Sequence, residues 1–315
     1  MSRVIEIFRE IAYNFKKYIK HPEKAICNIG EYNNYQFGFF IPDKIYIKCF
    51  YKKHMKKTLN LKNPKTFNEK IQWLKLYDRK TVYTTMVDKA EVKRLVANIL
   101  GEEYIIPTLG VWDDPNEIDF EKLPAQFVLK TTHDSGGIII CKDKSTLDIE
   151  RTISKLKEFL KKRAFYYGRE WPYKNVKPRI IAEAYMADSH EELNDYKFFC
   201  FNGKPKALFV ATDRHKDTKF DFFDLDFNHL PIVNGHPNAH RKFDKPQNFE
   251  KMIEIAEKLS AGIPHVRVDL YNVDSRILFG ELTFSHYSGI VPFEPEEWDG
   301  IMGEWINLPK RKKRG

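Results

Sequence analysis

Residues 267–284 read RVDLYNVDSRILFGELTF, a pattern typical of two strands joined by a tight turn. Apolar and polar residues alternate over 267–271 and again over 277–284. The segment between them, 272–276, is short and polar, as a hairpin turn requires. The pattern therefore predicts an antiparallel hairpin in this part of the chain.

Two carboxylates stand at matching places in the predicted hairpin. Side chains in a strand alternate between its two faces. We therefore expect one face of the first strand to carry Arg267, Asp269 and Tyr271, and one face of the second strand to carry Phe279, Glu281 and Thr283. If Asp269 lies opposite or diagonal to Glu281, both project from one side. A hard divalent cation would then find oxygen ligands there beside the phosphates of a nucleotide. The alternative is an ordinary strand pair with charges on its wet face.

Composition bounds the class of protein. The chain has 315 residues, which suits two domains or one large one. Its net charge of +9 and its pI near 9.1 indicate anionic partners, such as a nucleotide, nucleic acid, an acidic polysaccharide or a lipid surface. The cysteines Cys27, Cys49, Cys141 and Cys200 form no C-x-x-C pair, which is typical of reduced thiols in a cytosolic protein without a zinc site.

The N-terminal segment has an amphipathic pattern. Apolar side chains recur at helical spacing over residues 3–20, with basic residues between them. We expect a helix packed on the body of the protein, and a membrane-surface helix is the alternative. No apolar core follows the first charges, which argues against a signal peptide, and no run approaches the roughly 18 apolar residues of a membrane helix.

Helix boundaries are indicated at two places. Residues 66–69, TFNE, have the pattern of a capping box and predict a helix start. A second helix is predicted to begin after Asp88 and to stop at Gly101, since glycine is the usual residue just past a helix end. No linker rich in Pro, Gly or Ser marks a boundary, so any domains are expected to pack closely.

Residues 130–137, KTTHDSGG, carry a second signal. Two glycines let a backbone approach a phosphate closely, and Lys130 at the end of the preceding strand would supply a point charge. The context is strand, loop, strand, which disfavours both a Walker loop and a Rossmann turn, because each of these opens a helix. A bare hairpin turn is the alternative.

Other single residues are weaker candidates. Arg214 follows a predicted strand and is placed to meet a phosphate or a developing charge, with a solvated loop arginine as the alternative. His133 and His286 are candidate acid–base groups, but without a visible partner each is more simply a hydrogen-bonding loop residue.

Several segments occur in a fixed order along the chain: 63–70 (NPKTFNEK), 88–89 (DK), 127–130 (FVLK), 195–203 (DYKFFCFNG), 267–271 (RVDLY) and 279–284 (FGELTF). Together they resemble the ATP-grasp superfamily and, more closely, the TupA-like ATP-grasp family found with bacterial capsule and teichuronopeptide biosynthesis. The resemblance covers about residues 40–305. Many ATP-grasp enzymes carry Asn where this chain has Thr283, so the resemblance implies a site for either one or two magnesium ions.

The resemblance implies an α+β, ATP-grasp fold in which two subdomains with antiparallel sheets hold ATP between them. The implied organisation is a helical and irregular N-terminal region (1–60), a linking region (61–125), a subdomain with the glycine loop (126–186), a subdomain with the magnesium site (187–306) and a basic tail (307–315).

The resemblance also implies a set of residues that bind ATP: Lys93, Lys130, Ser135, Gly136, Gly137, Glu183, Tyr185, Met186 and Asp195. The two lysines would contact phosphates, the loop would cover them, and the glutamate would accept from the adenine amino group beside the backbone of Tyr185 and Met186. The aspartate would lie near the ribose. Asp269 and Glu281 would bind Mg2+. Catalysis would fall to Lys130 and to Arg214, which would steady the transferred phosphoryl group.

The implied activity is that of an ADP-producing carbon–nitrogen ligase, which joins an amino acid or another amine to a uronic acid of a surface polysaccharide through an acyl phosphate. A phosphotransferase acting on a sugar hydroxyl is the alternative, and genes of this family are also labelled glycosyltransferases. A non-enzymatic binder of anionic polymers is a third reading, carried by the basic tail. We expect no specific nucleic-acid partner and a cytoplasmic protein, with attachment to the inner membrane face or to capsule assembly machinery as a further option.

Overall fold

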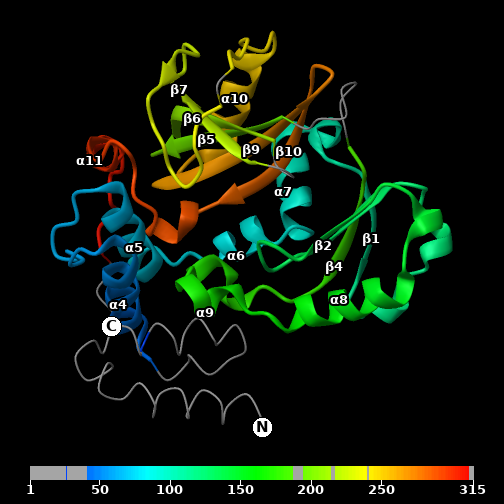
Figure 1. Ribbon diagram of the computed structural model, residues 1–315. Coiled ribbons are helices and arrows are strands. Elements are labelled where there is room, and N and C mark those ends of the chain that lie inside the picture. Colours follow the sequence, from blue (N-terminus) through cyan, green and yellow to red (C-terminus); the bar gives the residue numbers. More distant parts are fainter. Residues whose placement is uncertain (1–25, 27–40, 187–193, 214–216, 240, 312–315) are drawn as a thin grey trace.

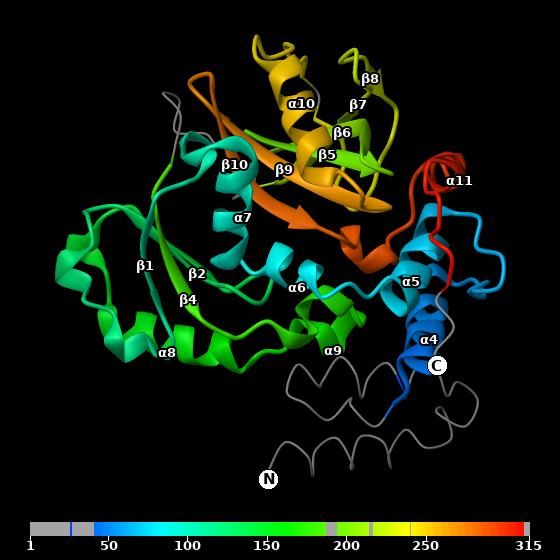
Figure 2. The same ribbon diagram turned by 180° about the vertical axis from the view of Figure 1, so that it is seen from behind.

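Residues 26, 41–186, 194–213, 217–239 and 241–311 are described by the computed structural model (Figure 1). Their core is a pair of antiparallel sheets with helices packed on the faces, which confirms the predicted α+β class. The reverse view shows α6 (Val82–Val87) and α7 (Glu91–Leu100) lying between the two sheets (Figure 2). The helix predicted over residues 3–20 and the candidate Arg214 lie outside the described residues.

All strand pairs in the two sheets are antiparallel. The smaller sheet has the order β1-β4-β2-β3 and is built from β1 (Thr108–Trp112), β2 (Phe127–Thr131), β3 (Ile138–Cys141) and β4 (Ile180–Ala184). The larger sheet has the order β10-β9-β5-β6-β7-β8 and is built from β5 (Asp195–Phe201), β6 (Lys204–Thr212), β7 (Lys219–Phe223), β8 (His229–Leu230), β9 (His265–Val273) and β10 (Arg276–Thr283).

The remaining helices flank these sheets. They are α4 (Asp43–Met55), α5 (Phe67–Tyr77), α8 (Ile149–Lys161), α9 (Ala164–Gly168), α10 (Phe249–Ser260) and α11 (Glu297–Glu304). Short 3-10 turns are η2 (Glu102–Tyr104), η3 (Pro115–Glu117), η4 (Phe120–Lys122), η5 (Lys144–Thr146), η6 (Trp171–Asn175) and η7 (His286–Gly289). No helix in the described part of the chain has both the length and the apolar character needed to cross a bilayer.

The smaller sheet has one closed face and one open face. α8 packs on the closed face, over a core that includes Phe127 and Leu129. Alternation along β2 and β4 turns Lys130 and Glu183 to the open face. Large apolar side chains remain exposed on that same face: Val111, Ile138 and Ile140. An exposed apolar surface with a few charged groups is typical of a ligand-binding face.

The larger sheet is buried on both faces along most of its length. One face packs against α7 and α10 through an apolar core that includes Phe198 and Val268. The other face packs against α5 and α11 through a second core that includes Phe199 and Phe209. On this second face the end formed by β9 and β10 is polar, and this end holds the charged side chains described below.

The predicted hairpin is β9 and β10. The turn consists of Asp274 and Ser275, both with left-handed backbone (φ +47° and +65°), as a two-residue type I′ turn requires. Asp269 lies directly opposite Glu281 in the ladder, which confirms that the two carboxylates share a side.

One detail of the predicted alternation is wrong. The register shifts between Phe279, which faces Leu270, and Glu281, which faces Asp269, so Gly280 forms a bulge. A Cβ on Gly280 would lie only 3.0 Å from the backbone oxygen of Asp269. The bulge turns Phe279 into the core under α10, away from the face that carries Glu281.

Both predicted helix boundaries are found. The Thr66 hydroxyl accepts from the Glu69 N–H at 3.3 Å, and the Glu69 carboxylate accepts from the Thr66 N–H at 3.4 Å, so α5 begins with a capping box. Asp88 accepts from the N–H of Ala90 at 2.9 Å ahead of α7, and α7 ends at Gly101 with φ +118°.

Candidate active site

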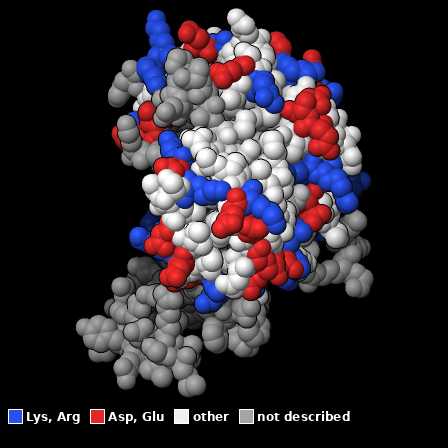
Figure 3. All heavy atoms as spheres, turned by 90° about the vertical axis from the view of Figure 1, so that its right-hand side faces the viewer, with Lys and Arg blue, Asp and Glu red and all other residues white. Residues whose placement is uncertain are grey.

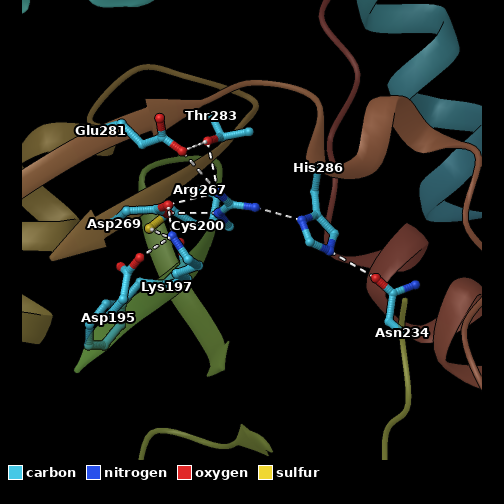
Figure 4. Close-up of polar contacts among 10 residues, drawn as sticks. Asp195, Lys197, Cys200, Asn234, Arg267, Asp269, Glu281, Thr283 and His286 are labelled. Carbon is cyan, nitrogen blue, oxygen red and sulfur yellow. Dashed lines mark hydrogen bonds and ion pairs between the residues drawn. The ribbon is translucent and has the colours of Figure 1, made fainter. Parts of the chain in front are cut away.

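Five ionisable side chains from three neighbouring strands meet at the polar end of the larger sheet (Figure 4). The Lys197 ammonium contacts Asp269 and lies 2.7 Å from Asp195. Arg267 holds the same Asp269 through two donors, Nε to Oδ1 and Nη2 to Oδ2, each at 2.7 Å. Glu281 is held more loosely, since Nη2 of Arg267 is 3.4 Å away and 39% of the glutamate side chain is exposed.

The charges of this cluster are fixed by burial and by close partners. Burial alone would raise the pKa of Asp269, but the charges of Arg267 and Lys197 outweigh it and hold the pKa well below its usual range. Burial would lower the pKa of Arg267, and Asp269 raises it instead. Asp269 and Arg267 therefore stay ionised throughout the physiological pH range, and Glu281 is the carboxylate most open to a ligand.

A neutral histidine, His286, contacts the Arg267 nitrogen that does not bond to Asp269. His286 Nδ1 lies 2.6 Å from Arg267 Nη1, and His286 Nε2 lies 2.8 Å from Asn234 Oδ1. Because a guanidinium only donates, Nδ1 accepts and Nε2 carries the hydrogen given to Asn234. Burial, then the charge of Arg267, lowers the pKa of His286 well below its usual value. His286 is therefore a hydrogen-bonding residue that orients the guanidinium, as one of the two readings of the sequence proposed.

The candidate lysines of the nucleotide site meet at one glutamate. Glu183 is buried, with Lys93 Nζ 2.5 Å from Oε1 and Lys130 Nζ 2.5 Å from Oε2. Burial would raise the pKa of Glu183, and the charges of Lys130 and Lys93 lower it instead. Both carboxylate oxygens are engaged in this state. Each of these oxygens has a second lone pair, so Glu183 keeps the capacity to accept a further hydrogen bond.

The glycine loop between β2 and β3 is held by a side-chain contact at its base and is exposed at its tip. The Thr131 hydroxyl contacts the Asp134 carboxylate across the base of the loop. A Cβ on Gly137 would lie 2.0 Å from Thr131 Oγ1, so this position admits only glycine without rearrangement. Ser135 and Gly136 are exposed at the tip, and Gly136 has φ +152°. An exposed tip of this kind leaves backbone N–H groups available to an anion.

Tyr173 on η6 packs against the apolar core on the α7 and α10 face of the larger sheet. Burial raises its pKa well above the usual value, and the charge of Glu281 raises it further. The neighbouring α6 connects the two halves of the site. Tyr83 on α6 packs against Phe284 just past β10, and Lys89 after α6 donates its backbone N–H to the Thr132 carbonyl at the base of the glycine loop at 3.2 Å.

The predicted hinge residues lie just past β4. Tyr185 and Met186 follow the last residue of that strand, and Met186 packs against an apolar group that includes Ile106 and Leu278. This contact joins the end of the smaller sheet to β10 of the larger one. Asp195 begins β5, where it is buried beside Lys197.

The carboxylates suit a divalent cation only in company with a nucleotide. Within the described residues, no three His, Cys, Asp or Glu side chains converge on one point. The protein would thus supply Asp269 and Glu281, with the Thr283 hydroxyl 3.3 Å from Glu281 Oε1 as a further oxygen. A hard cation needs about six oxygen ligands, so phosphates and water would supply the rest. Arg267 and Lys197 would have to turn from Asp269 toward the phosphates.

The structure brings the predicted pair Asp269 and Glu281 together, and it adds two cationic partners to which the sequence analysis gave no role. Arg267 was expected on the face of Asp269, which was the available signal, yet no role was assigned to it. Lys197 stands two residues after Asp195 and shares its face by the same alternation. His286 gave no such signal, because it lies on η7 and meets Arg267 only through the fold.

Comparison with known proteins places this arrangement in a wider group. A sequence model of the family described as TupA-like ATPgrasp matches residues 69–307, which is more than half of the chain. No curated protein gives a match.

Several solved structures are similar in part. D-alanine–D-alanine ligase from Bacillus anthracis complexed with ATP matches at 15% identity over 64% of this chain and 54% of that chain, with a TM-score of 0.38. The ATP-grasp ligase PsnB complexed with minimal precursor, Mg and ADP matches at 11% identity over 69% and 57%, with a TM-score of 0.38. The ADP complex of PurK, an N5-carboxyaminoimidazole ribonucleotide synthetase, matches at 11% identity over 70% and 52%, with a TM-score of 0.42. This chain spans little more than half the length of these proteins.

Proposed function

The chain belongs to the TupA-like ATP-grasp family, and from that membership we propose that it is an ATP-dependent carboxylate–amine ligase. A substrate carboxylate attacks the γ-phosphorus of ATP, ADP leaves, and an acyl phosphate forms. An amine then attacks the acyl carbon, and inorganic phosphate leaves as the amide forms. The observation that carries the proposal is the pairing of Asp269 opposite Glu281, beside the two buried cations Arg267 and Lys197.

The side chains divide the phosphate chemistry among them. Lys93 and Lys130, which hold Glu183 in this state, would each exchange that contact for a phosphate oxygen. The loop Ser135–Gly137 would cover the phosphates with backbone N–H groups. Arg214 is proposed to steady the phosphoryl group in transfer, where positive charge lowers the barrier most.

The nucleoside would lie along the open face of the smaller sheet. Exposed apolar side chains there suit a base, and Glu183 would accept from its amino group. The backbone of Tyr185 and Met186 would complete the contact at the hinge. Asp195 would lie on the ribose side, next to Lys197.

Asp269 and Glu281 would hold magnesium, which would draw charge from the phosphoryl oxygens when bound. The cations that now pair with Asp269 have a role in the same event. Arg267 and Lys197 would turn to the γ-phosphate oxygens as Asp269 is taken up. His286 would keep the guanidinium in line while this exchange occurs.

For the substrates we propose a uronic acid of a bacterial surface polysaccharide, or its precursor, and an amino acid or another amine. The positive net charge of the chain agrees with an anionic sugar acid. We propose a cytoplasmic location, where ATP is supplied, and the free cysteines among the described residues suit it.

Isotope transfer tests the reaction class directly. A uronic-acid acceptor labelled with 18O in its carboxyl group is incubated with ATP, magnesium and a pool of amino acids, and the products are weighed by mass spectrometry. Ligation moves one 18O from the acceptor into inorganic phosphate and yields an amide. A product that retains phosphate on a sugar hydroxyl, with no label in free phosphate, would replace the ligase by a phosphotransferase.

A further inference from the structure

Apart from the candidate active site, a second pocket lies between the loop that precedes α5, the first two turns of α5 and the segment that follows α11. Its volume is about 440 Å³, within the range typical of small-ligand sites. The polar and aromatic side chains that line it are Lys62, Asn63, Lys65, Lys70, Trp73 and Asn307. Three lysines, two asparagines and one tryptophan thus line one open pocket, and no acidic residue lines it.

The wall of this pocket is built rigidly. Asn60 Oδ1 accepts from the N–H groups of Lys62 and Asn63 at 3.2 and 3.1 Å, which shapes the loop ahead of α5. On the other side, α11 is packed so closely that a Cβ on Gly303 would lie 2.2 Å from the backbone oxygen of Lys65. Both sides of the pocket are therefore held by contacts within the protein.

The carboxylate of Glu69, which lies next to Lys65, is engaged by backbone N–H groups. Glu69 accepts from the backbone N–H groups of Asn60 at 3.1 Å and Lys65 at 2.8 Å, and it also caps α5. Among the described residues, neither Lys62 nor Lys65 forms an ion pair. Burial, and then the charge of Lys65, lowers the pKa of Lys70, and the charge of Glu304 acts in the opposite direction.

The gathering of Lys62, Lys65 and Lys70 without an acidic residue in the lining is particular to this pocket. On the face shown in Figure 3, Lys and Arg side chains are interspersed with Asp and Glu around an uncharged centre. The pocket differs because its only charged lining groups are cations. Within the segment 63–70, Thr66, Glu69 and Phe67 build the helix start and the core. Lys70 donates to the Ile306 carbonyl at 2.8 Å, whereas the side chain of Lys65 forms no ion pair among the described residues.

We propose that this pocket binds an anionic sugar unit of the glycan on which the enzyme acts, at a place separate from the nucleotide site. Ammonium groups would pair with the acidic group, and the amides of Asn63 and Asn307 would bond sugar hydroxyls. The edge of Trp73, largely buried, would offer an apolar surface to the sugar ring. The inference deepens the proposed function by naming a polymeric, acidic acceptor that is held at two points.

The lining of the pocket favours a glycan over a membrane. A bilayer surface meets protruding apolar and basic side chains, whereas here two amides and an indole accompany the lysines. Holding the polymer here would raise its local concentration at the active site through the connecting chain. The acidic group is either a carboxylate or a phosphate, since both pair with lysine, and the experiment separates these two sources.

Calorimetric titration of the full chain with tetragalacturonate tests the inference. Its methyl ester serves as the matched neutral ligand, and glucose 1-phosphate and inorganic phosphate serve as the phosphate arm. We expect tetragalacturonate to bind, the ester to bind at least tenfold more weakly, and binding to weaken between 50 and 300 mM salt because charges drive it. Tighter binding of the phosphate compounds would assign the acidic group to phosphate.

Paired variants locate the binding. Lys62→Gln combined with Lys65→Gln should weaken tetragalacturonate binding at least tenfold and leave ATP hydrolysis unchanged. Lys155→Gln combined with Lys161→Gln removes the same charge from the exposed face of α8 and should change neither. Glu281→Gln should still bind the oligosaccharide, so loss of ligase activity and loss of this site are separable.

Two results would overturn the inference. One is equal affinity in the wild type and in the Lys62, Lys65 double variant. The other is lysine-dependent binding to vesicles of anionic phospholipid, with none to tetragalacturonate or to the phosphate compounds, which would assign the pocket to a membrane.

Discussion

Replacing Asp269 by Asn and Glu281 by Gln should separate two properties that this pair combines. Both changes remove one negative charge and keep the shape of the side chain. Asp269 is 1% exposed, with both oxygens held by Arg267 and Lys197, whereas Glu281 is 39% exposed and has its nearest cation at 3.4 Å. We expect both variants to lose turnover but only one to lose stability.

The magnitudes follow from these contacts. Asp269→Asn leaves two buried cations without their shared carboxylate, which costs about 3–5 kcal/mol. With roughly 2 °C of melting temperature per kcal/mol in a chain of this size, the midpoint should fall by about 6–10 °C. Glu281→Gln breaks a long, partly exposed contact worth at most about 1 kcal/mol, or roughly 2 °C. ADP release should fall roughly 100-fold or more in both variants.

The assay combines thermal melting without nucleotide and ADP release with magnesium and acceptor. Glu257→Gln is the matched control, because it breaks an exposed ion pair with Lys204 on the far side of the sheet and should change neither measurement. A wild-type melting midpoint in Asp269→Asn would refute the buried network. Wild-type turnover in Glu281→Gln would remove that residue from the proposed magnesium site.

The same network has a defined pH dependence. The pKa of Asp269 is lower in the folded protein than in the unfolded chain, so its contribution is complete above the unfolded value of about 3.9 and is lost as pH falls through the folded value. The difference in unfolding free energy between the wild type and Asp269→Asn should therefore be constant from about pH 6 to 8. It should shrink in acid below about pH 4. A difference that grows in acid would contradict this sign.

Three further changes probe the remaining parts of the site. Lys130→Met removes one of the two ammonium groups on Glu183 and one proposed phosphate contact, so the Kd for ATP measured by calorimetry should rise about 10- to 100-fold; an unchanged Kd would contradict the phosphate role. Gly137→Ala places a Cβ 2.0 Å from Thr131 Oγ1 and should lower the free energy of unfolding, measured by chemical denaturation, by about 1–3 kcal/mol. An unchanged free energy of unfolding would show that the base of the loop can rearrange to accept the methyl group. His286→Leu leaves the guanidinium without its neutral acceptor, so kcat should drop about tenfold with the Kd for ATP preserved, whereas a loss of ATP binding alone would refute the positioning role.

The sequence by itself determined the local parts of this protein. Alternation and a short polar turn were enough to predict the hairpin, because strand period and turn geometry are properties of neighbouring residues. The pairing of Asp269 with Glu281, expected as opposite or diagonal, also needs the bulge at Gly280. The capping box at Thr66 was equally local. The glycines at 136 and 137 likewise marked the loop between β2 and β3.

Only the tertiary structure decided what those parts meet. The bulge at Gly280 depends on how β10 pairs with β9 and packs on the core. Because of it, Phe279 lies on the face opposite to the predicted one. Lys197 reaches Asp269 because β5 pairs with β9, across 72 residues of sequence. Such pairings depend on the packing of whole elements, which no local pattern encodes.

The second pocket illustrates the same division. The lysines at 65 and 70 stand in a segment that the sequence analysis used only for the helix start and for the family resemblance. Their convergence depends on the segment after α11 returning to the start of α5, where Lys70 Nζ donates to the backbone oxygen of Ile306 at 2.8 Å. Residue types and local turns were thus readable from the chain, whereas the neighbours that give each charge its function were set by long-range packing, because contact energies between distant segments act only once the chain has folded.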